Sequence, residues 1–222
     1  ADDAARGFAF IDLCRKRYDA VVMNPPFGEF SKMWKKSVQS IYQYSYNDIL
    51  GAFVDSFLFL LKSNGLLGAI TSRTCFYITS FSDWRTKVLL SNSALTVVAD
   101  LGQGVMDDAM VEAAAYVLQR SQSRSSTPFF RIITSRQKEP VLYRIVQAHN
   151  ESKYDDCLFL SFQKTFNLLA DSPFVYWIQA KDLEKIFPAE LSNAKLNQSK
   201  YSFLMNEEAG IYDDLIITKV EG

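Results

Sequence analysis

A short apolar run that ends in two prolines stands out near the start of the chain: Asp19-Ala20-Val21-Val22-Met23-Asn24-Pro25-Pro26-Phe27-Gly28. The apolar part predicts a buried strand over residues 19–23, and the prolines end that strand because they cannot continue its hydrogen bonding. Ligands of open α/β sheets bind outside the carboxyl ends of strands. The turn that follows this strand is therefore the first candidate for a functional site.

The turn would present two hydrogen-bond acceptors and one aromatic face. The acceptors are the side-chain oxygen of Asn24 and the carbonyl oxygen of Pro25, and the ring is that of Phe27. Pro25 and Pro26 each fix φ near about −65°, which leaves the acceptors little freedom. Such a set suits an exocyclic amino group on a flat ring. A strand-to-loop turn without a function is the simpler alternative.

Asn24-Pro25-Pro26-Phe27 resembles the Asn-Pro-Pro-Tyr/Phe motif of amino methyltransferases that use S-adenosyl-L-methionine, above all the N6-adenine-specific DNA methyltransferases. The resemblance implies that Asn24 and the Pro25 carbonyl accept hydrogen bonds from the adenine amino group. It also implies that Phe27 stacks on the flipped base, that Pro26 stiffens the turn, and that Asn24 holds the amino group in line with the methyl group of the cofactor.

Asp12 is a second candidate, for binding the cofactor. In the family, an acidic residue about a dozen positions before the Asn-Pro-Pro turn ends the preceding strand and binds the amino group of the cofactor adenine. The resemblance implies this role for Asp12, at the end of a strand that we expect over Phe8–Leu13. A surface aspartate before a turn is the alternative.

The composition sets mild bounds on function. The chain has 222 residues, 48% of them hydrophobic, which supports one sizeable domain with a real core. Its net charge of −1 excludes a generally basic nucleic-acid binder, so any contact with DNA must come from local patches. The three scattered cysteines form no Cys-x-x-Cys pair, which indicates neither a metal site nor a disulfide framework and favours a reduced, cytoplasmic setting. No apolar run is long enough to cross a membrane, and the lone His149 is expected at a surface or a helix end.

Strands and helices alternate after the turn, which predicts an α/β fold with a parallel sheet. Asn47–Asn64 is expected to form a helix that Asn47 caps and Gly65 ends, because Ile49, Phe53, Phe57, Leu60 and Leu61 recur at helical spacing. The further elements expected are strands over Leu66–Thr71 and Leu95–Ala99 and a helix over Phe81–Leu90 with Trp84, Val88 and Leu89 inward. By resemblance, these correspond to the fourth to sixth strands of the Rossmann-like methyltransferase fold, the C-terminal half of its sheet.

One segment offers a competing interpretation. Asp100, Gly102 and Gly104 follow an apolar strand, as in the cofactor loop that some circularly permuted DNA methyltransferases place after the catalytic turn. No second acidic strand end follows about 20 residues later, as a partner for the ribose would require. We favour the sixth-strand interpretation. The glycine-rich cofactor loop would then precede Ala1, and we expect this piece of a longer protein to bind the cofactor poorly and to be inactive alone.

Three other regions carry weaker indications. Ser31–Tyr46, with Lys32, Lys35 and Lys36, reads as a loop or short helix that either contacts DNA phosphates or is simply solvated. Ala113–Gln119 and Phe129–Thr134 are expected to pair as a hairpin. The basic residues between Gln119 and Lys138 form either a phosphate-tracking patch or a solvated surface.

The second part of the chain has a different texture. Lys138–His149 is expected to be a helix with Pro140 in its first turn and one apolar face, formed by Val141, Leu142, Ile145 and Val146. A short helix is expected over Lys181–Phe187. Ser172–Trp177 is similar to a segment that follows the catalytic domain in the PglX methyltransferases of BREX phage defence and in type IIG restriction–modification enzymes. Its aromatic residues either pack in a linker or stack on bases.

These observations predict two regions and one main function. Residues 1–135 would be the C-terminal half of a methyltransferase domain, and residues 136–222 a mixed α+β extension that leads towards a target-recognition region. The function implied by the resemblance is methylation of double-stranded DNA at adenine N6 in a restriction–modification or phage-defence system. A nuclease or specificity domain in the same full-length chain is a further expected partner. The alternatives are methylation of rRNA guanine N2 or of protein glutamine N5, and a non-catalytic DNA-binding module.

Overall fold

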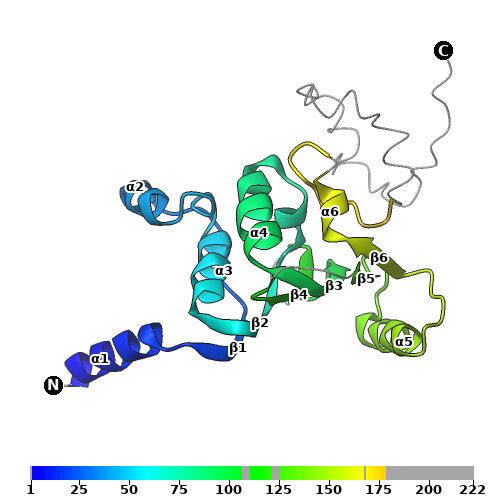
Figure 1. Cartoon of the computed structure of the whole chain (residues 1–222), viewed down its shortest axis with the longest axis horizontal. Coiled ribbons are helices and arrows are strands. Elements are labelled where there is room, and N and C mark those ends of the chain that lie inside the picture. The colour runs from blue at the N-terminus through cyan, green and yellow to red at the C-terminus, as the bar shows by residue number, and fades with distance from the viewer. Residues whose placement is uncertain (1, 107–110, 122–125, 168, 179–222) are drawn as a thin grey trace, which may run out of the picture.

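The computed structural model describes residues 2–106, 111–121, 126–167 and 169–178. Within them, one mixed six-stranded sheet has the order β1-β2-β4-β3-β5-β6 (Figure 1). Its strands are β1 (Tyr18–Met23), β2 (Leu61–Ser72), β3 (Ala94–Gly102), β4 (Ala113–Gln119), β5 (Ser126–Arg131) and β6 (Leu158–Phe162). The main helices are α1 (Asp2–Arg15), α2 (Lys32–Ile41), α3 (Ile49–Leu60), α4 (Leu90–Asn92), α5 (Lys138–Asn150) and α6 (Gln163–Phe166), and a π-helical segment, Trp84–Leu89, leads into α4.

The directions of the strands decide where a functional site can form. β1 pairs with β2 in parallel, and β4 lies between β2 and β3 and is antiparallel to both. β1, β2 and β3 therefore point the same way, and their carboxyl ends, at Met23, Ser72 and Gly102, meet at one edge of the sheet. This arrangement confirms the predicted α/β class, and the Asn24–Phe27 turn lies at that edge, but the sheet is mixed rather than parallel. The predicted burial of the strand before the turn is wrong, because β1 lies at the end of the strand order and its Val22 is 87% exposed.

The helix after the turn is confirmed, with corrected ends. Asp48, not Asn47, caps α3, because the Asp48 carboxylate accepts a hydrogen bond from the Leu50 amide at 2.9 Å. The helix ends at Leu60, so Gly65 does not stop it but lies in β2. A Cβ atom at Gly65 would lie 3.0 Å from the carbonyl oxygen of Tyr18. Glycine is needed there because strand β1 passes so close.

The buried face of α3 differs from the set of apolar residues that recurs at helical spacing. The buried side chains are those of Leu50, Val54 and Leu58, whereas Phe53 is 39% exposed. Most residues of this helix are apolar, on all of its sides, so their helical spacing does not distinguish the face that packs against the core. By contrast, Trp84, Val88 and Leu89 are buried as predicted.

Two predicted strand arrangements are wrong. Phe8–Leu13 belongs to helix α1, because a short apolar run does not by itself distinguish a strand from a helix. Ala113–Gln119 and Phe129–Thr134 do not form a hairpin, since β4 pairs with β2 and β3 while β5 pairs with β3 and β6. Ala113 and Ala114, on opposite faces of β4, are both fully buried, which suits a central strand covered on both sides.

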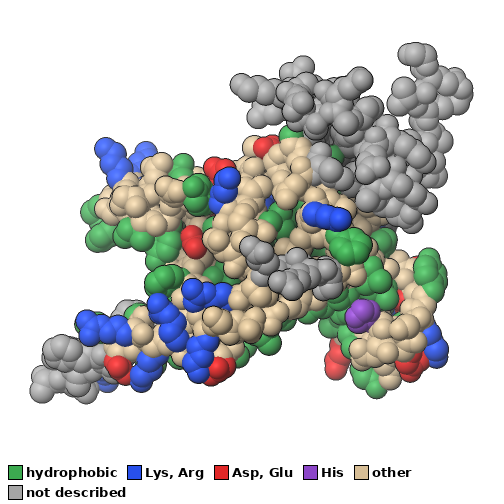
Figure 2. Space-filling view, in the orientation of Figure 1, with side chains coloured by type: hydrophobic (Ala, Val, Ile, Leu, Met, Phe, Trp, Pro, Cys, Tyr) green, Lys and Arg blue, Asp and Glu red, His purple; other side chains and the backbone are tan. Residues whose placement is uncertain are grey.

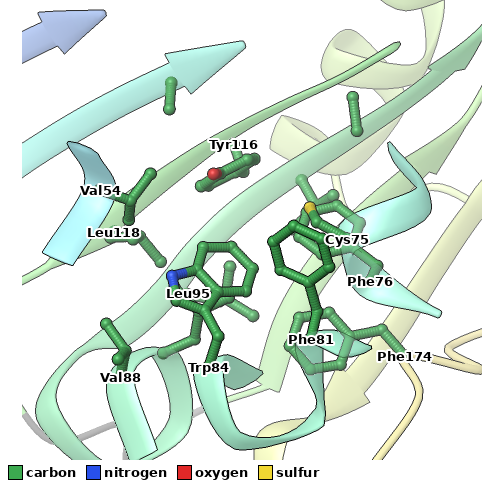
Figure 3. Close-up of a cluster of buried hydrophobic side chains, with 14 of the residues drawn as sticks. Val54, Cys75, Phe76, Phe81, Trp84, Val88, Leu95, Tyr116, Leu118 and Phe174 are labelled. Carbon is green, nitrogen blue, oxygen red and sulfur yellow. The ribbon is translucent and has the colours of Figure 1, made fainter. Parts of the chain in front are cut away.

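The core lies mainly between the sheet and the α3 and α4 side of the molecule (Figure 1). Trp84 and Phe81 meet edge to face at 5.4 Å, and Phe174 stacks on Phe76 at 5.1 Å (Figure 3). A second cluster forms on the other side of the sheet, where Ile145 of α5 packs near Phe130. The apolar face predicted for α5 is therefore confirmed. The helix expected over Lys181–Phe187 lies outside the described residues.

The three free cysteines have different environments, which gives a test of the core. Cys14 is exposed, whereas Cys75 is fully buried and burial raises the pKa of its thiol to about 12. A thiol that is both inaccessible and protonated does not react as a nucleophile.

We expect Cys14 to react rapidly with an aromatic disulfide reagent at pH 8, and Cys75 to react only after urea unfolding. A Cys75→Ser variant assigns the slow group, and rapid reaction of Cys75 in the folded chain would contradict the described core.

Candidate active site

The Asn24–Phe27 turn combines an open end with an anchored one. Asn24 is exposed, and its side chain makes no hydrogen bond to any residue that the structure describes. Pro25 is buried, and Phe27 is half-buried against the main core cluster. The amide of Asn24 is therefore available to a ligand, while its neighbours hold the turn against the protein.

Gly28, directly after the turn, joins it to the start of α3. The Gly28 amide donates to the Asp48 carboxylate, 3.2 Å from Oδ1 and 3.3 Å from Oδ2. In the other direction, the Ile49 amide donates to the Gly28 carbonyl oxygen at 2.9 Å. Gly28 has φ +116°, in the region that favours glycine. Sequence reasoning did not identify Asp48 as part of the site, although an aspartate just before an apolar helix is a recognisable cap.

A buried charged network occupies the carboxyl ends of β2 and β3 at the same edge. The Asp100 carboxylate is fully buried and accepts from Arg73 Nε at 2.6 Å and from Arg73 Nη2 at 2.9 Å. It also accepts from the hydroxyls of Tyr77, at 3.0 Å, and Tyr176, at 2.6 Å. Glu112 accepts from Arg73 Nη1 at 2.7 Å. This network ties three segments that are distant in sequence to one carboxylate.

The electrostatics of the network keep Arg73 charged and the tyrosines neutral. Burial opposes the charge on Arg73, but the surrounding oxygens of Tyr77, Asp100 and Glu112 raise the pKa of its guanidinium overall. Burial raises the pKa of Tyr77 and of Tyr176 well above the ordinary tyrosine value, and the nearby carboxylate adds to this. The two hydroxyls therefore remain hydrogen-bond donors to Asp100.

This pairing bears on the alternative interpretation of residues 100–104 as a cofactor loop. Both oxygens of Asp100 are already occupied by Arg73 and the two tyrosines. At Gly102, φ is +66° and a Cβ atom would lie 2.9 Å from the backbone of Ile133, so this glycine serves a close approach between segments of the protein. The structure therefore favours the sixth-strand interpretation, with Asp100 in a structural pair.

Asp12 does not lie at the end of a strand. It is in helix α1, where its side chain is 64% exposed and forms an ion pair with Lys16 one turn later, at 2.6 Å. The strand from which it was expected to reach the cofactor is absent from the described residues 2–15, which form a helix instead. The reason for placing Asp12 at the cofactor is therefore lost, and our proposal leaves this residue out.

In the basic segment between Gln119 and Lys138, three described residues contact other parts of the fold, whereas Arg136 is exposed. Arg120 donates to the carbonyl oxygens of Phe59 and Leu61, and the Lys138 ammonium donates to that of Ile132 at 2.9 Å. The Arg131 guanidinium lies over the ring of Trp177 at 5.1 Å. Arg124 lies outside the described residues. Arg120, Arg131 and Lys138 therefore make contacts within the fold, while a phosphate-tracking role for the segment stays a prediction.

Helix α2 carries a more accessible basic surface. Lys32, Lys35 and Lys36 lie on one face of this helix, and Trp34 and Ile41 lie on the opposite face. Lys35 is partly engaged by Glu29, at 3.4 Å, while Lys32 and Lys36 are exposed. In Figure 2 some Lys and Arg side chains lie at the top of the α2 end, and a larger group lies lower in the view, over the α1 and β1 region. The helix that was one of the two expectations for this region is confirmed.

The aromatic segment Ser172–Trp177 packs into the protein. Phe174 is fully buried, and the ring of Tyr176 stacks on that of Phe129 at 4.4 Å. Arg85, itself buried, donates to the carbonyl oxygens of Asp171 and Ser172, and burial lowers the pKa of its guanidinium to about 10. Packing of a linker, one of the two expectations for these aromatic residues, is therefore confirmed.

An apolar groove of about 650 Å³ lies beside the strands. It is lined by residues of several strands and of α5, among them Met23, Gly68, Ala99, Phe130, Val146 and His149. The groove reaches Met23, the residue before Asn24, but the turn itself does not line it. Among the described residues, no group of His, Cys, Asp and Glu side chains is arranged to hold a metal ion, and no helix is long and apolar enough to cross a bilayer.

Comparison with known proteins shows which family the first half of the chain is similar to. Residues 2–105 match the model of the family described as Eco57I restriction-modification methylase. The chain is 26% identical, over 181 residues, to the adenine-specific methyltransferase BrxX of Escherichia coli O9:H4 (strain HS). That match covers 74% of this chain but 14% of BrxX, so the chain spans about one seventh of the length of this curated relative.

Solved structures show the same fold. A modification subunit of a putative type I restriction enzyme from Vibrio vulnificus YJ016 superimposes with a TM-score of 0.57 and 14% identity, over 68% of this chain and 35% of that chain. The type IIG restriction endonuclease BpuSI gives a TM-score of 0.51 and 15% identity, over 66% of this chain and 19% of that chain. The predicted resemblance is confirmed: residues 2–105 are similar to the Eco57I restriction-modification methylase family, and the sheet shares the fold of these two solved structures.

Proposed function

We propose that this chain is part of an N6-adenine-specific DNA methyltransferase of a restriction–modification or phage-defence system. The observation that carries the proposal is the free side chain of Asn24 beside the anchored Phe27, at the carboxyl end of β1. The similarity to BrxX, which is named an adenine-specific methyltransferase, supports adenine as the target. Strands β2 and β3, which point in the same direction as β1, end at the same edge of the sheet, and α/β sheets bind their ligands at that edge.

The turn binds and orients the target amino group. Adenine must leave the duplex to reach it, which costs a few kcal/mol, and stacking on Phe27 returns about 1–3 kcal/mol of this. The Asn24 side-chain oxygen and the Pro25 carbonyl oxygen accept hydrogen bonds from the two N–H groups of the adenine amino group. These bonds draw the nitrogen lone pair out of conjugation with the ring. S-adenosyl-L-methionine would supply the methyl group on a sulfonium, whose displacement by the amino nitrogen yields a thioether and a proton that is released to solvent. The residues contribute mainly by holding the nitrogen in line.

The parts of the site differ in how well they fit the cofactor. Asn24 fits, since its exposed amide can lie beside the transferred methyl group, whereas Asp12 lies in helix α1 and not at the strand end from which it was expected to reach the cofactor. We retain the division into a catalytic part, residues 1–135, and an extension, residues 136–222, although β6 of the extension adds to the same sheet. A nuclease or specificity domain elsewhere in the full-length chain and a cytoplasmic location remain part of the proposal.

The test is a transfer assay with the full-length protein. It is supplied with methyl-labelled S-adenosyl-L-methionine and, separately, with duplex DNA, rRNA and protein. The proposal expects label on DNA, recovered as N6-methyladenine after nuclease digestion. Label on rRNA guanine or on protein glutamine would replace the proposed substrate with one of the alternative amino groups. DNA binding without transfer to any of the three would indicate a non-catalytic module.

The lysine face of α2 gives a prediction about DNA contact. Lys32 and Lys36 are exposed and separated by one helical turn, so both can approach the same phosphate backbone. Replacing both with Gln in the full-length protein should weaken DNA binding and make the slope of log affinity against log salt shallower by about 1–2. Titrations at several salt concentrations measure this slope. Lys87→Gln with Lys153→Gln removes the same charge from two other exposed positions and should leave the slope unchanged; equal effects of the two pairs would exclude a local contact.

A further inference from the structure

Asp48 performs two tasks with one carboxylate. Its Oδ1 atom accepts from the Leu50 amide at 2.9 Å, which caps helix α3, and from the Gly28 amide at 3.2 Å. Its Oδ2 atom lies 3.3 Å from the same Gly28 amide. The first bond belongs to the helix, and the second reaches across 20 residues of chain to the position that follows Phe27.

The bond from Ile49 makes the connection reciprocal. The Ile49 amide donates to the Gly28 carbonyl oxygen at 2.9 Å, so Gly28 is held at both its donor and its acceptor. Amides in the first turn of a helix have no partner within the helix, and one of those of α3 is thus satisfied by the chain that leaves the Asn24–Phe27 turn. The turn is thereby fixed to the amino end of α3.

Helix α3 is itself immobilised by the core. Leu50, Val54 and Leu58 are almost fully buried, and Val54 has no exposed surface. A chain of contacts therefore runs from the core through α3 to Asp48, from Asp48 to Gly28, and from Gly28 to the turn. Burial raises the pKa of Asp48 because it disfavours the charged carboxylate. The hydrogen bonds from the Leu50 and Gly28 amides act in the opposite direction and favour that charge.

We propose that Asp48 is a positioning residue for methyl transfer, because its carboxylate fixes Gly28 and with it the orientation of Asn24 and Phe27. This inference rests on the proposed function of the turn. A displacement of about 1 Å at a reacting group can lower a rate by about 100-fold, so loosening the Gly28 contact should reduce the rate of transfer more than the binding of DNA or cofactor.

Three substitutions at Asp48 separate positioning from helix capping. Asp48→Asn keeps an Oδ1 acceptor for both amides, Asp48→Ser keeps a short cap for the helix but not the reach to Gly28, and Asp48→Ala keeps neither. Asp55→Ala is the matched control, since Asp55 lies in the same helix and bonds to Ser45 at 2.6 Å, away from the turn. All are made in the full-length protein, with kcat, KM for DNA and thermal midpoint measured together.

The expected result is a fall in kcat of about 10- to 100-fold for the Ser and Ala variants, with kcat of Asp48→Asn and Asp55→Ala close to wild type. KM for DNA should change little, and the thermal midpoint of Asp48→Ser should stay near that of the wild type. Unchanged kcat in Asp48→Ser, or a loss of kcat in Asp48→Asn as large as in Asp48→Ala, would overturn the inference. If the wild-type protein transfers no methyl group to DNA, or if Asn24→Ala keeps full activity, it is the proposed function that fails instead.

Discussion

Replacing Asn24 with Ala is expected to reduce methyl transfer by the full-length enzyme at least about 100-fold, the size of effect seen when one positioned hydrogen-bonding group is removed from an active site. The methyl side chain of alanine would offer no acceptor to the target amino group, and only the Pro25 carbonyl and the Phe27 ring would remain. Since Asn24 makes no hydrogen bond within the described residues, its removal should cost the fold little. Single-turnover transfer of labelled methyl groups to duplex DNA measures the rate.

Two further measurements make this result specific. DNA affinity, followed by fluorescence anisotropy, should remain close to that of the wild type, because stacking and phosphate contacts are intact. Asn24→Asp retains an acceptor oxygen and should keep more activity than Asn24→Ala. Asn92→Ala removes an exposed asparagine whose amide donates only to Lys87 at a helix end, and should leave transfer unchanged. Transfer by Asn24→Ala at the wild-type rate would refute the role of the turn.

Replacing Asp100 with Ala is expected to destabilise the 222-residue chain by about 3–5 kcal/mol, the usual range for removing one partner of a buried ion pair. The large effect arises because Arg73 stays behind as a buried charge, only 5% exposed, and loses one of the two carboxylates that it contacts among the described residues, the other being Glu112. The hydroxyls of Tyr77 and Tyr176 also lose their acceptor. Urea unfolding followed by tryptophan fluorescence measures the loss.

Smaller changes in the same network calibrate this value. Tyr176→Phe removes one donor and leaves the ion pair, so a loss of about 1 kcal/mol is expected. Asp83→Ala removes an exposed aspartate that makes no capping hydrogen bond, and should have almost no effect. If Asp100→Ala lowered the free energy of unfolding as little as Asp83→Ala, the Arg73 guanidinium would have to be solvated, and the described buried network would be wrong.

The part of the fold that sequence could predict is the part with strong local signals. The apolar run before two prolines gave β1 and the turn, and the spacing of Trp84, Val88 and Leu89 gave the helical segment before α4. Local signals also mislead: the apolar run Phe8–Leu13 predicts a strand, but it lies within a 14-residue helix. With no glycine or proline to end the run, length could not decide between the two forms.

The rest depends on contacts between distant residues. Nothing near β4 indicates that it inserts between β2 and β3, since this pairing is decided by which strands can bury both faces of Ala113–Gln119. Asp100 gave one available signal, a carboxylate within the apolar strand Leu95–Leu101, but its partners Arg73 and Tyr176 lie 27 and 76 residues away. For the site, the acceptors were visible in the sequence, whereas the attachment of Gly28 to Asp48 was not.

The bonds between Gly28 and the Asp48–Ile49 pair close residues 29–47 into a side branch with a fixed root. The length of this branch has little effect on the stability of the turn, because each doubling of a closed loop costs only about 0.6 kcal/mol of loop-closure free energy. Insertions beside the exposed helix α2 would therefore leave the acceptors at the root in place, whereas Tyr42, Ser45 and Asn47 bond to the body of the protein and need to be kept. Variation in how such enzymes grip their substrates can accumulate here without disturbing the chemistry.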